Sequence, residues 1–383
     1  MHLSFVAADS SALSPVGYGS AGGHAVYMRE LVKALSKTGA VCTTYSCHML
    51  NDDCTTSVRG SGNTVVSVGV RESDPIRRAR KFGERIGSLL HCETQAIHAN
   101  YWLGGISADS ASAYTGIPYL VTYHSLALIK YKHGSVLDET RAQWERTLSE
   151  KASGISYAWN GERSDICALY PWTKNRLHII SPGVRLDVFK PGNKAQAKKL
   201  LDLNFQKVAV CVGRVQEYKG THIAIQALSV LENKNTGLVI IGDLAYDPGY
   251  SQYLQSLVYA HGLGDRVKFV NPVEHSALAS YYQAADLLML PSRHESFGLV
   301  ALEAMACGTP VVVSLPRGEQ PIHSLQGYTT VNRDPESFAQ AMESTLGGRD
   351  ECTGSPHSAL RQYAELFSWA QSAKDALRAY DTL

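Results

Sequence analysis

Asp286-Leu-Leu-Met-Leu290-Pro-Ser-Arg-His-Glu295-Ser-Phe-Gly298-Leu-Val-Ala-Leu-Glu303-Ala-Met-Ala-Cys-Gly308-Thr-Pro310 is the stretch that decides the fold. It opens as a short apolar strand, breaks into a Ser/Gly loop and continues as a helix rich in Ala, Leu and Met, which Gly308-Thr-Pro310 ends. Glu295 therefore lies in the loop and Glu303 in the helix. The backbone N–H groups at the start of that helix have no intrahelical partners, so they favour an anion or a hydroxyl. The structural alternative is an ordinary strand–helix corner with one capping glutamate and one exposed glutamate.

Composition places this corner in a large α/β protein. The chain has 383 residues, of which 44% are hydrophobic and 19% charged, so it is too long for one typical domain. The net charge of +1 gives no reason to expect nucleic acid or an acidic membrane as a partner. No apolar run approaches the ~18 residues that span a bilayer, so we expect no integral membrane segment. Met1–Asp9 is expected to form a first strand and not a signal peptide.

The eight cysteines are scattered, with no C-x-x-C spacing, and the chain contains no Asn-x-Ser/Thr site. Reduced cysteines in apolar segments behave as small hydrophobic residues. These features predict a reducing, cytoplasmic location.

Strand and helix patterns alternate on both sides of the corner, which predicts parallel sheets covered by helices. In the first half, residues 51–63 are polar and predict a loop. The expected strands there cover residues 3–8, 40–45, 64–70, 96–99, 119–123, 154–158 and 177–180, and the expected helices cover 22–37, 75–90, 105–114 and 138–151. The expected strands of the second half cover 208–212, 238–241, 267–270, 287–290 and 311–313, with helices starting near Thr221, Tyr250, His275 and Phe297. Pro182-Gly183-Val184 predicts a hinge between the halves, and residues 335–383 are expected to be mostly helical.

Basic residues follow the first strand of the second half. Val212-Gly213-Arg214 ends that strand, and Lys219-Gly220 opens the next helix. A guanidinium and an ammonium five residues apart at the carboxyl end of a parallel strand suit a diphosphate. A solvated pair neutralised by Glu217 is the alternative. The chain contains no Asp-x-Asp, the carboxylate pair that metal-dependent diphosphate sites normally use, so we expect chemistry without a metal.

A glycine-rich run, Gly17-Tyr-Gly19-Ser-Ala-Gly22-Gly23, formally contains G-x-G-x-x-G. A dinucleotide-binding fingerprint would place the first glycine directly after the strand and an acid about 20 residues later, and neither condition is met. The better interpretation is that Gly22-Gly23 let the backbone approach a phosphate at the start of a helix.

The chain resembles the retaining glycosyltransferases of family 4, which have the GT-B architecture. Glu295, Ser296-Phe297-Gly298, Glu303, Ala304 and Cys307-Gly308-Thr309-Pro310 match the family's glutamate pair in order. His98-Ala-Asn-Tyr101-Trp102-Leu-Gly104 and Val121-Thr122-Tyr-His124-Ser125 agree with a subgroup that includes sucrose-phosphate synthases and the mycothiol-pathway N-acetylglucosaminyltransferase. The resemblance implies an α/β GT-B fold of two Rossmann-like, doubly wound domains that face each other across a cleft. Residues 1–183 would bind the acceptor, with the helix 366–383 packing back on them, and residues 184–365 would bind the donor.

The resemblance also implies residue roles. Glu295 would hold hydroxyls of the donor sugar, Glu303 the ribose hydroxyls, and main chain near Val273 the base. His124 matches a position that contacts the donor sugar. The implied catalytic residues are His124, Arg214, Lys219 and Glu295; the implied donor-binding residues are Gly22, Gly23, Gly213, Arg214, Lys219, Val273, Glu295, Ser296, Phe297, Gly298, Leu299 and Glu303; Tyr101, Ser125 and Arg141 match acceptor-side positions. His98 is as consistent with a structural histidine as with a ligand.

The implied reaction moves a hexose or N-acetylhexosamine from a nucleoside diphosphate sugar, UDP-glucose or UDP-N-acetylglucosamine, to a hydroxyl of a cyclitol, aminocyclitol or sugar phosphate. It requires no cofactor and no metal, the leaving diphosphate serves as the base, and a homodimer is left open. Arg185 and residues 315–322 depart from the family pattern, which leaves the donor sugar open. The alternatives are a nucleotide-sugar epimerase or phosphorylase on the same fold, and a non-catalytic UDP-sugar binding protein.

Overall fold

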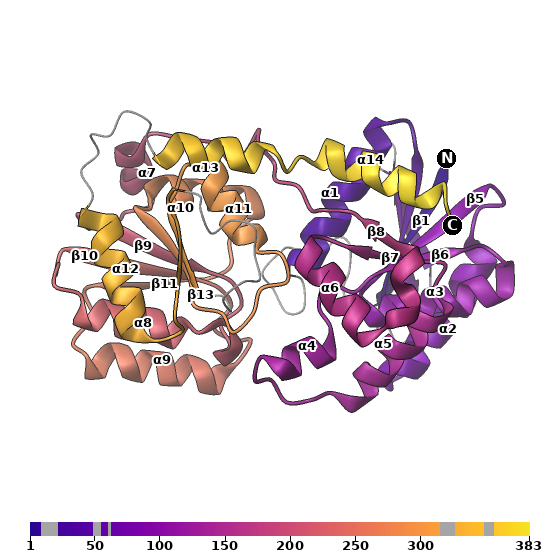
Figure 1. The fold of residues 1–383 in the computed structure, drawn as a ribbon, viewed down its shortest axis with the longest axis horizontal. Coiled ribbons are helices and arrows are strands. Elements are labelled where there is room, and N and C mark those ends of the chain that lie inside the picture. The colour runs from indigo at the N-terminus through magenta and orange to yellow at the C-terminus, as the bar shows by residue number, and fades with distance from the viewer. Residues whose placement is uncertain (9–21, 49–54, 60–62, 315–325, 348–355) are drawn as a thin grey trace. The chain divides into compact units, whose positions relative to one another are not determined.

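The computed structural model describes residues 1–8, 22–48, 55–59, 63–314, 326–347 and 356–383 (Figure 1). They form two compact units that divide between Gly183 and Val184. Unit 1 comprises the first strand, Gly23–Gly183 and Trp369–Leu383, and unit 2 comprises Val184–Ser368. Within the described parts of the chain, no helix is both long enough and apolar enough to span a membrane.

Unit 1 is built on an eight-stranded sheet in the order β3-β4-β2-β1-β5-β6-β7-β8. All neighbouring strands are parallel except β3, which pairs antiparallel with β4 at the edge. The order reverses between β1 and β5, as in a doubly wound sheet. The strands are β1 His2–Ala7, β2 Val41–His48, β3 Thr55–Arg59, β4 Asn63–Gly69, β5 Thr94–Asn100, β6 Tyr119–Thr122, β7 Gly154–Tyr157 and β8 Leu177–Ile179.

Helices cover both faces of this sheet because successive side chains of a strand point to opposite faces. On β1, Val6 packs in one hydrophobic cluster with α2, α3 and α5, whereas Leu3 and Phe5 pack in another with α1 and the C-terminal helix α14 (Figure 1). The helices of unit 1 are α1 Gly23–Lys37, α2 Pro75–Leu89, α3 Tyr101–Thr115, α4 Ala127–Lys132, α5 Glu139–Lys151, α6 Asn160–Leu169 and α14 Trp369–Tyr380, with a 3-10 turn η1 at Pro171–Arg176.

Unit 2 has a six-stranded, fully parallel sheet in the order β11-β10-β9-β12-β13-β14. This is the Rossmann order, and the point where the order reverses lies between β9 and β12. The strands are β9 Lys207–Val212, β10 Thr236–Ile241, β11 Val267–Val270, β12 Leu287–Leu290, β13 Val311–Ser314 and β14 Tyr328–Val331. The helices are α7 Lys194–Leu200, α8 Thr221–Val230, α9 Pro248–Ala260, α10 Leu278–Ala284, α11 Leu299–Ala306, α12 Pro335–Gly347 and α13 Pro356–Glu365, with short turns η2 Glu217–Lys219 and η3 His275–Ala277.

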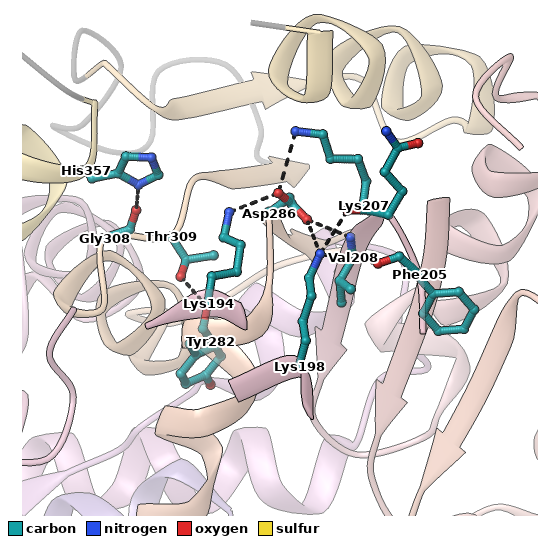
Figure 2. Close-up of polar contacts among 11 residues, drawn as sticks. Lys194, Lys198, Phe205, Lys207, Val208, Tyr282, Asp286, Gly308, Thr309 and His357 are labelled. Atoms are coloured by element: carbon teal, nitrogen blue, oxygen red, sulfur yellow. Dashed lines mark hydrogen bonds and ion pairs between the residues drawn. The ribbon is translucent and has the colours of Figure 1, made fainter. Parts of the chain in front are cut away.

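Asp286 fixes the start of β12 against the start of β9 (Figure 2). Its Oδ2 accepts the backbone N–H of Val208 at 2.8 Å. The ammonium groups of Lys194, Lys198 and Lys207 lie 2.9, 3.5 and 3.7 Å from its carboxylate oxygens. Burial raises the pKa of Asp286, but the nearby lysine charges and hydrogen bonds outweigh burial and hold the pKa below 3.8. The strand that leads to Glu295 is therefore anchored at its first residues.

The α/β class and all twelve expected strands are confirmed. The expectation that residues 51–63 form only a loop is wrong, because Thr55–Arg59 is strand β3. Helix α3 begins at Tyr101, four residues before the expected start at Gly105. The short helices α4, α6 and α7 and the strand β14 were not expected. These elements are short, and tertiary packing decides short segments more than local pattern does.

Candidate active site

Lys219 and Glu295 meet at the carboxyl edge of the unit 2 sheet, at the point where the strand order reverses. Lys219 follows β9 in the turn η2, and Glu295 follows β12. The Lys219 ammonium donates to Glu295 Oε1 at 2.6 Å. Because ligands of open α/β sheets bind at the carboxyl ends of the strands at this reversal, the ion pair occupies the expected ligand position of unit 2.

The two loops that carry this pair press against each other at Gly220. Gly220 has φ +73, and a Cβ atom added there would lie 2.1 Å from the carbonyl oxygen of Pro291. Arg333 Nε donates to the same carbonyl at 2.9 Å. Only glycine fits this contact without moving a backbone, so the sequence Lys219-Gly220 sets how closely Lys219 approaches the β12 loop.

The Glu295 carboxylate is held in its ionised form. Burial alone would raise the pKa of Glu295. The charge of Lys219 and the hydrogen bonds from Lys219 and Ser292 lower the pKa by more than burial raises it, so the pKa lies below 4.5. Ser292 Oγ donates to Glu295 Oε1 at 2.6 Å. Glu295 is therefore an acceptor for hydroxyl groups, and its second oxygen is not engaged by Lys219 or Ser292.

Arg214 lies two residues beyond the end of β9, and its side chain lies against Tyr246. Its Nη1 donates to the Tyr246 hydroxyl at 3.2 Å, and its guanidinium carbon lies 5.4 Å from the ring centroid. Glu217 pairs with Arg293 at 2.7 Å, so it neutralises neither Arg214 nor Lys219. The alternative in which Glu217 neutralises one of these two residues is therefore wrong for this structure.

Glu303 is buried in α11, and both of its oxygens have protein partners. His275 Nε2 lies 2.6 Å from Oε1, and the Tyr282 hydroxyl donates to Oε2 at 3.1 Å. The His275 ring packs against Phe189, with 5.2 Å between the ring centroids. Thr309 Oγ1 donates to the carbonyl of Tyr282 at 2.7 Å, a contact drawn in Figure 2. The exposed-helix alternative for Glu303 is wrong, since only 4% of the residue is exposed.

The remaining predicted donor residues surround this edge or the start of α1. Gly298 is the N-cap of α11 with φ +81, and Leu299 is the first residue of that helix. The ring of Phe297 packs edge-on against the ring of Phe367, with 5.7 Å between the ring centroids. Ser296 precedes Phe297 in the loop. Val273 lies between β11 and η3, packed against the core beneath α10 and α11.

Gly213 has φ +146 directly after β9. In unit 1, Gly23 is the first residue of α1 and Gly22 precedes it; the rest of the glycine-rich run lies outside the described residues.

His124 lies directly beyond β6 in unit 1 with a positive φ of 58°, a strained backbone for a residue other than glycine. Its Nε2 lies 3.0 Å from Asn100 Oδ1. Burial lowers its pKa well below 6.5, and the charges of His24 and His98 add to the effect. His124 is therefore a neutral imidazole. Because Asn100 Oδ1 can only accept, Nε2 carries the hydrogen, and Nδ1 is left as an acceptor for a hydroxyl group.

Arg141 joins the other two acceptor-side candidates. Its Nη1 donates to the Tyr101 hydroxyl at 2.7 Å. Its Nη2 donates to Ser125 Oγ at 3.1 Å and also to the Ser125 carbonyl. Its Nε donates to Glu145 Oε1 at 2.6 Å. Arg141 and Glu145 are both buried, and Glu145 Oε2 accepts the backbone N–H of Ala127. Arg141 thus supports Tyr101 and Ser125 in this structure, and its role toward an acceptor stays a prediction.

His98 is structural in this structure. It is buried, with Nδ1 2.6 Å from the Tyr380 hydroxyl and Nε2 2.7 Å from Thr122 Oγ1. Burial lowers its pKa to about 3. It joins β5 to the C-terminal helix α14.

Four residues that the sequence did not single out complete the site of unit 2: Ser292, His275, Tyr282 and Tyr246. Ser292 is close to Glu295 in the chain, so its role was open to sequence reasoning. Nothing in the sequence pattern connects His275 with Glu303, 28 residues away. Among the described residues, the one group with potential metal ligands close together is His2, His91 and Glu93, at the amino ends of β1 and β5 and away from all of these positions.

Two sequence families match the two halves of the chain. The family described as "Glycosyltransferase Family 4" matches residues 21–188, and "Glycosyl transferases group 1" matches residues 193–365. The D-inositol 3-phosphate glycosyltransferase 1 of Catenulispora acidiphila is 30% identical over 391 residues, covering 97% of this chain and 93% of the relative. The D-inositol 3-phosphate glycosyltransferase of Corynebacterium diphtheriae is 29% identical over 413 residues, covering 99% of this chain and 94% of the relative.

Solved structures share the fold over nearly the full length. The sucrose-phosphate synthase of Thermosynechococcus elongatus superposes with a TM-score of 0.87 at 27% identity, covering 99% of this chain and 98% of that one. Anabaena Alr3699/HepE, in complex with UDP and glucose, superposes with a TM-score of 0.79 at 19% identity, with both chains fully covered. The second likeness shows the fold alone.

Proposed function

The chain belongs to the family 4 glycosyltransferases of GT-B fold, and we propose that it transfers a hexose or N-acetylhexosamine from a UDP-sugar to a hydroxyl of a small polar acceptor, with retention at the anomeric carbon. The observation that carries the proposal is the Lys219–Glu295 contact of 2.6 Å where the unit 2 sheet reverses. A cation for a diphosphate and a carboxylate for sugar hydroxyls meet there, and the buried carboxylate of Glu303 lies in the helix α11 that follows the Glu295 loop.

In the proposed reaction, the bond between the anomeric carbon and the leaving phosphate oxygen breaks, and the diphosphate takes the electron pair. The acceptor oxygen forms its bond to the same face of the sugar, and its proton passes to the departing phosphate oxygen. Lys219 and Arg214 stabilise the charge that develops on the diphosphate, which is usually the largest catalytic contribution. The backbone from Ser296 to Leu299 supports Glu295 at the sugar. The absence of Asp-x-Asp from the sequence supports a mechanism without a metal.

For the carrier, we propose uridine diphosphate, with Glu303 at the ribose and main chain near Val273 at the base. The backbone of Gly22 and Gly23 at the start of α1 is proposed to approach the donor phosphate. His124 is proposed to accept one hydrogen bond from a hydroxyl of the donor sugar at Nδ1, because its ring is neutral and its Nε2 hydrogen is directed at Asn100. Glucose and N-acetylglucosamine are the two leading sugars. No cofactor is proposed.

For the acceptor, the relatives' names support a cyclitol phosphate, while the likeness to a sucrose-phosphate synthase supports a sugar phosphate. Both are polyols with one phosphate group. We propose that Tyr101 and Ser125, which both accept hydrogen bonds from Arg141, are the residues on the acceptor side.

A donor and acceptor screen tests the proposal. UDP-glucose and UDP-N-acetylglucosamine are each incubated with inositol phosphates, inositol and hexose phosphates, and UDP release and product mass are recorded. Release of UDP that depends on added acceptor supports transfer, and the anomeric coupling constant of the product reports retention. An epimerase would change the sugar without releasing UDP, a phosphorylase would require inorganic phosphate, and a binding protein would do neither.

A further inference from the structure

Both oxygens of the Glu303 carboxylate are held from within unit 2. His275 Nε2 lies 2.6 Å from Oε1, and the Tyr282 hydroxyl donates to Oε2 at 3.1 Å. The three side chains come from η3, α10 and α11; η3 runs directly into α10, so two segments of the chain meet at one carboxylate. Tyr282 is fully buried, and 11% of the His275 side chain is exposed.

The number of contacts matters because an ionised carboxylate has about four lone-pair positions, two on each oxygen. His275 takes one on Oε1 and Tyr282 takes one on Oε2. One position remains on each oxygen, and the two oxygens belong to a rigid planar group. This arrangement suits a pair of adjacent hydroxyl groups that donate one hydrogen bond each, as the 2′- and 3′-hydroxyls of a ribose do.

We propose that His275 is a positioning residue through which the site selects ribonucleotides over 2′-deoxyribonucleotides. The proposal rests on the assignment of Glu303 to the donor ribose under the proposed function. His275 fixes the rotation of the Glu303 carboxylate by occupying one side of Oε1, and Phe189 supports the His275 ring from behind, with 5.2 Å between the ring centroids. Without that contact, only the Tyr282 hydroxyl restrains the carboxylate, and the two-point fit to the ribose is weakened.

The test compares the affinities of the full chain for UDP and 2′-deoxy-UDP by titration calorimetry. One hydrogen bond to a charged acceptor separates the two ligands, so the wild-type protein should prefer UDP by about 10- to 100-fold. His275→Asn and His275→Leu should reduce this preference to about threefold or less, because neither side chain places a donor where Nε2 lies. His275→Gln, whose Nε2 can reach that place, should keep most of the preference. Tyr282→Phe should also reduce the preference for UDP, because it removes the hydrogen bond to Glu303 Oε2.

Removing a partner from a buried carboxylate costs stability, so each variant is first compared with the wild type by circular dichroism and thermal melting. His261→Gln, an exposed histidine at the end of α9, is the matched control and should leave the preference unchanged. If His275→Leu does not fold, the pair His275→Asn and His275→Gln decides the result.

The outcomes separate the two proposals. A wild-type protein that does not bind UDP contradicts the proposed function. A wild-type protein that binds both nucleotides equally contradicts the role of Glu303. A clear preference for UDP that stays within twofold of the wild-type value in folded His275→Asn overturns the inference about His275 and leaves the proposed function standing.

Discussion

Replacing Lys219 by methionine removes the ammonium and keeps most of the side-chain length. An ammonium group has three donors, and the 2.6 Å contact with Glu295 uses one. The other two remain for phosphate oxygens. Since a hydrogen bond to a charged group contributes about 1.5–3 kcal/mol, loss of one diphosphate contact predicts a drop in kcat/KM of about 10- to 150-fold. Glu295 also loses its cationic partner, which adds to the effect.

Titration calorimetry with UDP and with uridine separates the two contributions. UDP affinity should fall at least tenfold in Lys219→Met, whereas uridine affinity should change less than twofold because uridine has no phosphate. Lys199→Met, on the exposed side of α7, serves as the control. A folded Lys219→Met protein with kcat/KM within threefold of the wild type would refute the assignment of Lys219 to the diphosphate. An equal loss of affinity for UDP and uridine would assign the effect to general damage of the site.

Four further predictions concern other features of the chain. Glu303→Ala should weaken UDP and uridine alike by at least tenfold (~1.4 kcal/mol), measured by the same titration, since both ligands contain the ribose; an effect on UDP alone would be inconsistent with the ribose assignment. Asp286→Asn should lower the unfolding free energy of unit 2 by about 2 kcal/mol at pH 7. The folded pKa of Asp286 lies below 3.8, so this contribution is complete above the unfolded pKa and is lost as the pH falls through the folded pKa. Urea denaturation should therefore show the stabilities of the variant and the wild type converging only at pH values below 3.8. Arg141→Leu should destabilise unit 1 by about 3–5 kcal/mol in urea, because the buried carboxyl of Glu145 loses its cationic partner, and a loss below 1 kcal/mol would contradict that account. Transfer activity should persist in excess EDTA, and a loss that added magnesium restores would show that a metal is required.

The placement of Glu295 and Glu303 at one edge of the unit 2 sheet could be predicted from the sequence because these residues lie close together in the chain; their roles toward a donor stay predictions. Glu295 lies in the loop after β12 and Glu303 in the helix α11 that follows, and the glycine before the helix places both at the same edge of the sheet. Lys219-Gly220 carries its own signal, since the glycine is required where the two loops touch. Local pattern is informative here because the site follows directly from strands and helix starts.

The partners of these residues could not be predicted. His275 reaches Glu303 across 28 residues, and Arg141 reaches Tyr101 across 40. Such contacts depend on how helices pack, and packing leaves no fixed spacing in the sequence. The hydrogen bond from Arg214 to the Tyr246 hydroxyl could not be predicted for the same reason.

The edge strand β3 shows a different limit. Thr55–Arg59 is short and polar and lies among turn-forming residues, so its own sequence favours a loop. Pairing with β4 supplies the hydrogen bonds that make it a strand. A strand stabilised by one neighbour alone carries little signal of its own.

The return of the chain to unit 1 at Trp369 has a consequence for synthesis on the ribosome. The apolar cluster on one face of the unit 1 sheet includes Leu3 and Phe5 of β1 and Tyr27 of α1. It is completed by Trp369, Ala373 and Tyr380 from α14. That helix emerges only after all of unit 2 has been translated, although its partners were made first. Unit 2 can close its own core as soon as its last strand and helices appear, whereas the earlier half must keep an apolar surface uncovered throughout that time. Nascent chains should therefore depend on chaperones mainly through their amino-terminal half.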